Sequence, residues 1–247
     1  MIKFFRKIRQ NLLMENKTGK YFKYAIGEIV LVVIGILIAL SINNLNEHYK
    51  QIKLKNEYVV SLSNDLTNDT IQLNNRLILN KQMLKNIDTI AKEVNNANIK
   101  NASDLYKLIA EKYNAQGGIR TINTYNNNSF NLLIASGNID LFDKQLRQDI
   151  MELNRLQIFQ KEVAKSNSEY FLRFMERISV KYPEIEFSSD INGLDKLLWE
   201  GTKIDEYPRD VIAYLSQKNY TIQRYIELTE NVLMQTEKVL TQLKNQD

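Results

Sequence analysis

The sequence predicts an all-α membrane protein. A single N-terminal transmembrane helix is followed by an elongated antiparallel helical bundle of three long helices with short helical connectors. Three observations lead to this prediction. Residues 24–42 are almost purely apolar, residues 45–94 repeat apolar side chains every seven positions, and two later segments repeat them every three or four. Neither glycine nor proline interrupts the chain between Gly35 and Gly117, and strand signals are scarce.

Residues 24–42, YAIGEIVLVVIGILIALSI, form the predicted transmembrane helix. Twelve of these nineteen residues are Ile, Leu or Val, and Glu28 is the only formal charge. Their insertion contributes about −4 to −7 kcal/mol, against at most about +3 kcal/mol for a central acid. Nineteen helical residues cover about 28 Å, close to the hydrocarbon thickness of about 30 Å. A cleaved signal peptide, with Ala39-Leu40-Ser41 near the cleavage point, is the alternative, although its apolar core and basic region would be unusually long.

Positive charge is concentrated before this span. The first 23 residues carry a net charge of +6, and the chain's total of +4 leaves −2 for the remainder. The positive-inside rule therefore predicts a cytoplasmic tail at 1–23, the span at 24–42 and a helical extracytoplasmic domain at 43–247. The tail's basic side chains are the expected lipid-headgroup contacts: Lys3, Arg6, Lys7, Arg9, Lys17, Lys20 and Lys23.

Apolar residues in the tail also recur at helical spacing, at Ile2, Phe5, Ile8 and Leu12. This pattern is typical of a short helix lying in the membrane interface; the alternative is that the charges only enforce topology. The near-neutral remainder lacks the basic patch of a nucleic-acid-binding protein. The expected partner is therefore the lipid bilayer, and no nucleic acid is expected.

Two features of the span suggest interactions inside the membrane. Small residues four apart on one face allow a second helix to approach closely, which predicts association through that face, although small residues are common in membrane spans in any case. Glu28, the intramembrane acid, either pairs with a buried cation or extends to the cytoplasmic interface beside Lys23. The predicted association face consists of Gly27, Leu31, Gly35 and Ala39.

The first long helix after the span is predicted from a sevenfold repeat. Every seventh residue from Leu45 to Val94 is apolar except Asn80, which is typical of a helix buried along one seam. Several of the positions four residues after these are polar, which favours a broad bundle contact over a strict two-stranded coiled coil. The turn formers at 95–98 should end this helix, and a short helix should follow from Ser103 to Tyr113. The apolar seam positions are Leu45, Ile52, Val59, Leu66, Leu73, Ile87 and Val94.

A short helix and the second long helix should follow. Asn128 is the expected cap of a helix of about eight residues, ended by Gly137 in a left-handed conformation. Asp140 is the expected cap of the next helix, which runs to Lys181 before Pro183. Its apolar stripe is Leu146, Ile150, Leu153, Leu156, Val163, Tyr170, Phe174 and Ile178.

Residues 183–207, which include the only tryptophan, are interpreted as a return loop with a short amphipathic piece at 194–200. Pro208 suits the first turn of the third long helix, where its missing N–H costs nothing. This helix should run nearly to the end of the sequence. Its apolar stripe is Val211, Leu215, Ile222, Tyr225, Val232, Val239 and Leu243.

The sequence offers no catalytic constellation. It has no cysteine, which excludes disulfides and thiol chemistry, and its single histidine, His48, has no second histidine with which to share a metal. Glu227, Glu230 and Glu237 on the last helix are interpreted as a solvated face. Gly117-Gly118 does not belong to a phosphate-binding loop. We therefore expect no enzyme activity, no cofactor and no metal.

The N-terminal 47 residues resemble a flavobacterial family of uncharacterised single-span membrane proteins. The likeness is most specific in GEIVLVVIGILIAL and in the following NNLNE, where Leu45 stands at a position that is more often Trp in the family. A weaker likeness lies in residues 130–147, around Ser136-Gly137-Asn138. The resemblance implies a bacterial inner (plasma) membrane protein with a helical periplasmic domain. It implies no reaction, ligand or catalytic residue.

Two functions remain as predictions. The first is a membrane-anchored, non-catalytic interaction or scaffolding protein whose partner is a second copy of the chain or another membrane protein. The second is a ligand-sensing helical bundle that signals through a partner membrane protein, since a tail of 23 residues has no room for an output domain. A small molecule bound in a polar pocket between the long helices would favour the second function.

Overall fold

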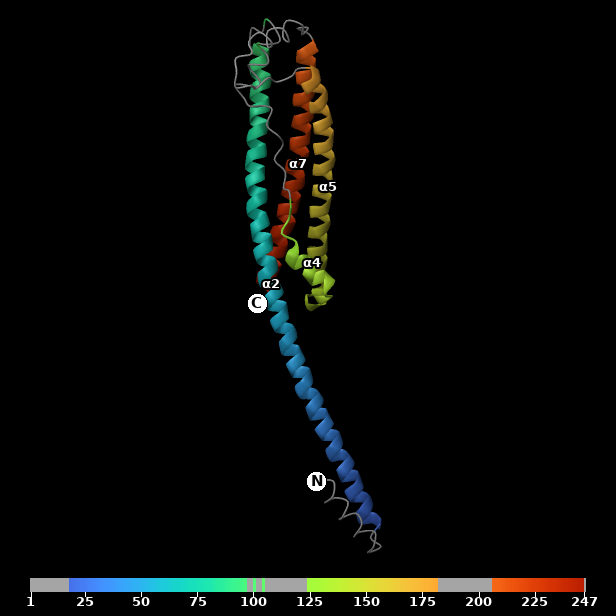
Figure 1. The fold of residues 1–247 in the computed structure, drawn as a ribbon. Helices are drawn as coiled ribbons and strands as arrows, with labels where there is room; N and C mark the ends of the chain where they lie inside the picture. The colour runs from blue at the N-terminus through green and yellow to red at the C-terminus, as the bar shows by residue number, and fades with distance from the viewer. Residues whose placement is uncertain (1–17, 97–99, 101–103, 105–123, 182–205, 247) are drawn as a thin grey trace, which may run out of the picture. The chain divides into compact units, whose positions relative to one another are not determined.

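The computed structural model describes residues 18–96, 100, 104, 124–181 and 206–246 (Figure 1). The regular elements in these ranges are α2 (Thr18–Asn96), α4 (Asn128–Ala135), the 3-10 helix η1 (Asn138–Leu141), α5 (Lys144–Lys181) and α7 (Glu206–Lys244). All of them are helical, which confirms the all-α prediction for this part of the chain. The predicted tail helix, nearly all of the 103–113 helix and of the return loop, and Gly117-Gly118 lie outside the described residues.

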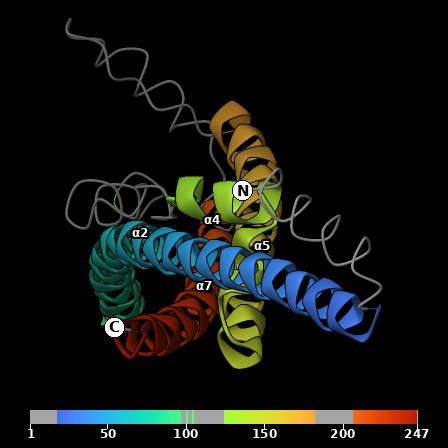
Figure 2. The same ribbon diagram turned by 90° about the horizontal axis from the view of Figure 1, so that it is seen from below.

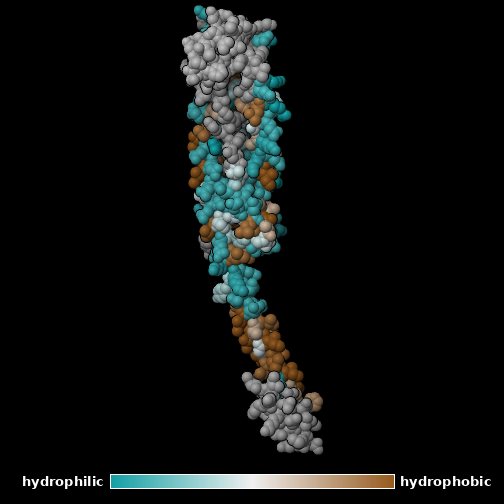
Figure 3. Space-filling model, viewed as in Figure 1, coloured by the Kyte–Doolittle hydropathy of each residue, from teal (hydrophilic) through white to brown (hydrophobic). Residues whose placement is uncertain are grey.

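The chain divides into two units, Met1–Glu57 and Tyr58–Asp247. In the first unit, α2 carries the apolar segment, and it is the one described helix that is long and apolar enough to cross a membrane. Its Ile, Leu and Val side chains at 26–42 are exposed, and Figure 3 shows this segment as a hydrophobic surface. Leu45 and Ile52 are also exposed, at 59% and 42%. The predicted seam is therefore wrong before Val59, because α2 is the only described element of the first unit.

From Tyr58 to Ile90, α2 buries a continuous seam, whereas the predicted seam residue Val94 is only half-buried. Val59, Leu66, Leu73 and Ile87 are buried as the sevenfold repeat predicts, and the polar Asn80 at the same register is fully buried. The positions three residues after each of these seam residues complete the buried face. These are Leu62, Asp69 and Ile90, with Arg76 and Met83 half-buried. A face built from positions separated by three and four residues is the one that a helix presents to its neighbours.

The short helix α4 has the eight residues that the sequence predicts. Gly137 follows it with φ of 71°, the left-handed conformation expected there. The predicted cap is wrong by one residue: Asn128 is the first residue of the helix, and the side chain at the N-cap, Asn127, makes no capping hydrogen bond. Asp65 of α2 supplies the cap instead, because its Oδ2 accepts from the Ser129 N–H at 3.2 Å. The α4 N-terminus is thus satisfied by another helix.

The predicted cap of α5, Asp140, is wrong, because the helix begins one short turn later. Asp143 caps the helix, since its Oδ1 accepts from the Leu146 N–H at 2.9 Å. Asp140 lies within η1 and forms an ion pair with Arg147. The 3-10 turn inserted between Gly137 and α5 explains this difference.

α5 and α7 pack against each other in opposite directions (Figures 1 and 2). Asp149 near the start of α5 contacts Lys238 near the end of α7, whereas Phe174 stacks on Tyr214 near the start of α7. Pro208 lies in the first turn of α7, and the seven predicted α7 stripe residues are all buried.

The α5 stripe is confirmed only in part. Leu146, Ile150 and Leu153 are buried, but Tyr170 is 49% exposed. Leu156, Val163 and Phe174 are half-buried, and the side chain of Ile178 lies outside the described part. Buried Gln157, Gln160 and Ala164 continue the inner face instead.

α2 runs against α7 and in the same direction as α5. Lys81 on α2 pairs with Glu230 on α7 at 2.8 Å, whereas Leu62 lies beside Val239 and Ile150 around one hollow. Three helices that run in two directions always include one parallel pair, and here that pair is α2 and α5. Two successive helices can run parallel only if the chain between them returns along the first helix. Asn126, just before α4, donates a hydrogen bond to Asp69 of α2, so the chain has returned by that point.

Candidate functional site

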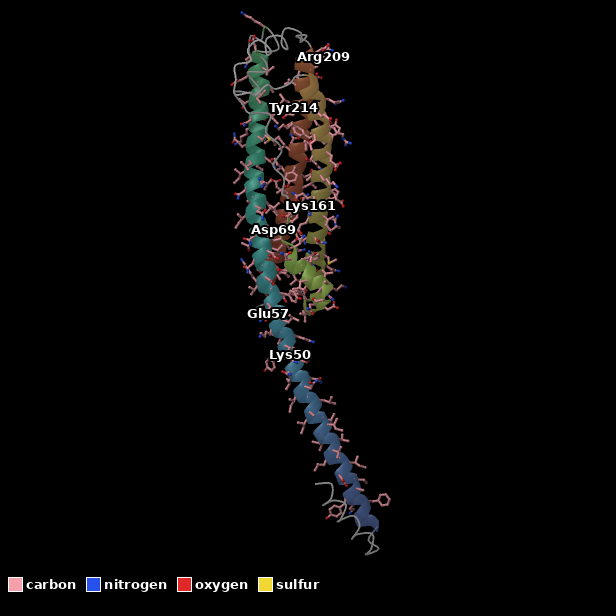
Figure 4. All side chains as sticks on the ribbon, viewed as in Figure 1. Lys50, Glu57, Asp69, Lys161, Arg209 and Tyr214 are labelled. Carbon is pink, nitrogen blue, oxygen red and sulfur yellow. The ribbon has the colours of Figure 1, made fainter. Side chains whose placement is uncertain are left out.

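Two carboxylates on α2 hold the segment that precedes α4. Asp69, labelled in Figure 4, accepts from the Asn126 N–H at 3.0 Å and from its Nδ2 at 2.7 Å. One helical turn earlier, Asp65 accepts from Ser129 as described above. Asp69 is fully buried, and this burial raises its pKa, although the bonds from Asn126 partly offset the increase. We call residues 125–129 the strap.

The strap continues into a buried polar chain between α5 and α7. The Tyr125 hydroxyl donates to Gln160 Oε1, and Gln160 Nε2 donates to Thr229 Oγ1 at 2.7 Å. Thr229 Oγ1 in turn donates to the Tyr225 carbonyl at 2.8 Å. Burial raises the pKa of Tyr125, so its hydroxyl keeps the proton that it donates. These bonds link the strap, α5 and α7 at one level of the second unit.

A second polar cluster surrounds Asp149 on α5. Its carboxylate accepts from Gln145 at 3.0 Å, Lys238 at 2.7 Å and Gln242 at 2.8 Å, and more weakly from Gln235 at 3.5 Å. Burial disfavours the charged form, but these side-chain donors outweigh it and lower the pKa of Asp149 to about 2. Asp149 is therefore a carboxylate at neutral pH and joins α5 to α7.

A small hollow lies between the strap and the long helices. Its cavity volume is about 20 Å³. Its polar lining includes Asp65, Asn126 and Asn154, together with Gln157. Gln157 is only 3% exposed, and its Nε2 has no hydrogen-bond partner within the described part of the chain. A buried donor without an acceptor is costly, which makes this hollow the strongest candidate for a ligand site in the second unit.

No described side chain covers the predicted association face. Gly27, Gly35 and Ala39 are exposed, Leu31 is 66% exposed, and a Cβ added at either glycine would meet nothing within 4 Å. Glu28, the predicted intramembrane acid, is half-buried. Of the predicted headgroup contacts, Lys23 is exposed and Lys20 lies in α2; Lys3 to Lys17 lie outside the described residues.

The described residues contain no group of three or more His, Cys, Asp or Glu side chains that could hold a metal. His48 is exposed on α2, in the first unit. Glu227, Glu230 and Glu237 are also exposed, as a solvated face requires; Glu227 pairs with Arg224 and Glu230 with Lys81.

Sequence reasoning missed the polar residues that build the hollow and the strap. Asp69 follows Leu66 by three positions, and Gln157 and Gln160 follow Leu153 by four and seven. Each therefore occupies a position that helical spacing places on the buried face. Their helical spacing could have identified these residues as buried, but a search for apolar stripes considers only apolar residues.

The comparisons with known proteins give one family. Residues 28–160, more than half of the chain, match the model of a Family of unknown function (DUF6090). The matched region includes most of the apolar segment, from Glu28 onward, and also the strap, α4 and the first part of α5, with Asp65 and Gln157 of the hollow. No curated protein and no solved structure matches the chain significantly. The chain therefore belongs to the family of unknown function DUF6090.

Proposed function

We propose that the protein is a membrane-anchored, non-catalytic interaction or scaffolding protein. In this proposal, residues 24–42 cross the bacterial inner membrane, the N-terminus is cytoplasmic and the domain at 43–247 is periplasmic. The observation that carries the proposal is the exposed apolar segment of α2, which has no described helix to cover it and which lipid would cover. The excess of basic residues before this segment supports the orientation.

We further propose that residues 58–96 of α2 close into one three-helix bundle with α5 and α7. Side chains from all three helices line the same hollow, and buried hydrogen bonds join α5 to α7. Polar bonds inside a core fix the register of helices more strictly than apolar contacts alone. Such a bundle would present a well-defined surface to a partner.

The surface available to a partner includes exposed apolar side chains. Met151, Ile158 and Leu172 lie seven or fourteen residues apart on α5 and are 48–62% exposed. In the membrane, the open face around Gly35 would accept a second helix. The partner in the proposal is a second copy of the chain or another membrane protein.

Site-specific crosslinking in native membranes tests this proposal. A photoreactive amino acid at the exposed Ile158 should give a reproducible crosslinked partner, which mass spectrometry identifies. The matched control carries the same residue at Leu153, which lies on the same helix and is 4% exposed, and should give no intermolecular product. Repeated scanning of exposed positions on α2, α5 and α7 that yields only monomer would refute the scaffolding role.

A ligand-sensing helical bundle that signals through a partner membrane protein is the second candidate function. The observation that favours it is the polar hollow, where α2, α5 and α7 meet and where Gln157 has an unsatisfied donor. A small molecule that copurifies with the wild-type chain but not with a variant altered at Gln157 would support sensing. Ligand-free protein whose crosslinked partners are unchanged by Gln157 substitution would favour scaffolding.

A further inference from the structure

The hollow beside Gln157 has the properties of a built site. Its lining residues come from α2, the strap, α4, α5 and α7, so several elements fix its shape. The volume of about 20 Å³ matters, because a water-sized group needs about 10–15 Å³ on this measure. The hollow therefore has room for one such group.

The donors and acceptors around the hollow define what it can hold. Gln157 Nε2 is buried and needs an acceptor. On the opposite helix, Asp65 uses Oδ2 for the Ser129 N–H, and an ionised carboxylate offers about four lone-pair positions in all. The occupant should therefore accept a hydrogen bond from the amide and donate one to the carboxylate.

The charge around the hollow further limits the chemical groups that it can hold. The Asp65 carboxylate lines it directly, so an anion would be repelled. No basic side chain belongs to its lining. A neutral hydroxyl group both accepts and donates, has the required size and would give Gln157 Nε2 the acceptor that it needs.

We propose that this hollow binds one neutral hydroxyl group, held between the Gln157 side-chain amide and the Asp65 carboxylate. The hydroxyl can come from a water molecule or from a small polyol whose remaining atoms extend to solvent. The inference goes beyond scaffolding, and failure of either proposal leaves the other standing.

A crystal structure of the full-length protein in detergent, grown without polyols and at a resolution that orders solvent, tests the site. The expected result is one solvent peak within about 2.7–3.2 Å of Gln157 Nε2 and of an Asp65 carboxylate oxygen. In Gln157→Met, which keeps the side-chain volume but removes the donor, the peak should be lost. The control Gln223→Met, at an exposed position of α7, should retain it.

Thermal unfolding with and without glycerol identifies the source of the hydroxyl. An equal increase in Tm for wild type and Gln157→Met, together with the solvent peak, assigns the site to water. A larger increase for the wild type assigns it to the polyol hydroxyl. An empty hollow in the wild-type crystal, or a Gln157 amide that donates to a protein acceptor, would overturn the inference even if the variant fails to fold.

Discussion

Asp149 is the residue whose chemistry most clearly links sequence to stability. A carboxylate with donors from both α5 and α7 stabilises their packing only while it is ionised. We predict that Asp149→Asn lowers the free energy of unfolding by about 2–4 kcal/mol, because the new amide N–H₂ faces other donors. Chemical unfolding followed by circular dichroism measures this loss. The control Asp140→Asn, whose side chain is 76% exposed, should change stability by less than about 0.5 kcal/mol.

The same residue predicts a pH dependence. The folded pKa of Asp149, about 2, lies below the ordinary value of 3.8, so the fold favours the charged form. This contribution is complete above pH 4 and is lost as the pH falls through the folded pKa. The stability difference between wild type and Asp149→Asn should therefore shrink between pH 4 and pH 2. A difference that stays constant over this range would exclude the ionised carboxylate as its cause.

Individual polar residues were the least predictable part of the structure. Gln157 and Gln160 have a side-chain type that is usually exposed, and both are buried because their partners or the hollow lie on neighbouring elements. The cap from Asp65 to α4 spans 64 positions in the chain. Such pairs depend on which helices meet, and the sequence alone does not give that information.

At the scale of elements, the α2 seam explains where this long helix is stabilised. Leu73 is fully buried, whereas Ile71 on the same helix is 56% exposed. We predict that Leu73→Ala costs about 2–5 kcal/mol of unfolding free energy, from lost burial and the cavity left behind. Ile71→Ala should cost less than about 1 kcal/mol in the same denaturant titration. Similar costs for both variants would contradict the seam.

The proposed membrane span, residues 24–42, offers a separate prediction. Gly35 leaves open space on its face of α2, so a second helix could approach closely there. Gly35→Ile should weaken self-association in a lipid-bilayer assay by about tenfold or more. Leu37→Ile, an apolar exchange two residues away, should have little effect. Unchanged association of the Gly35 variant would remove this face as an interface.

Elements were easier to predict than their arrangement. The α7 stripe, the length of α4 and the left-handed Gly137 followed from apolar spacing and glycine conformation, which are local properties. The seam before Val59 failed because an apolar repeat does not tell whether a neighbouring helix is present. The parallel course of α2 and α5 also escaped prediction, since it depends on the chain returning to Asp69 before α4.

At the scale of the whole molecule, the two units are expected to lie in different surroundings. The apolar segment of the first unit is exposed and would be covered by lipid, whereas the second unit has its own buried core and a mainly hydrophilic surface in Figure 3. From the charge pattern we propose that the second unit lies on the periplasmic side. Every proposed partner or ligand of the second unit would then have to be periplasmic.

A topology reporter fused after Asp247 tests this central claim most directly. Alkaline phosphatase is active only outside the cytoplasm, and green fluorescent protein exported in unfolded form stays dark, so the paired fusions report opposite locations. The account predicts an active phosphatase and a dark fluorescent protein in cells that express the full-length chain. An inactive phosphatase with a bright fluorescent protein would place the second unit in the cytoplasm and contradict the account.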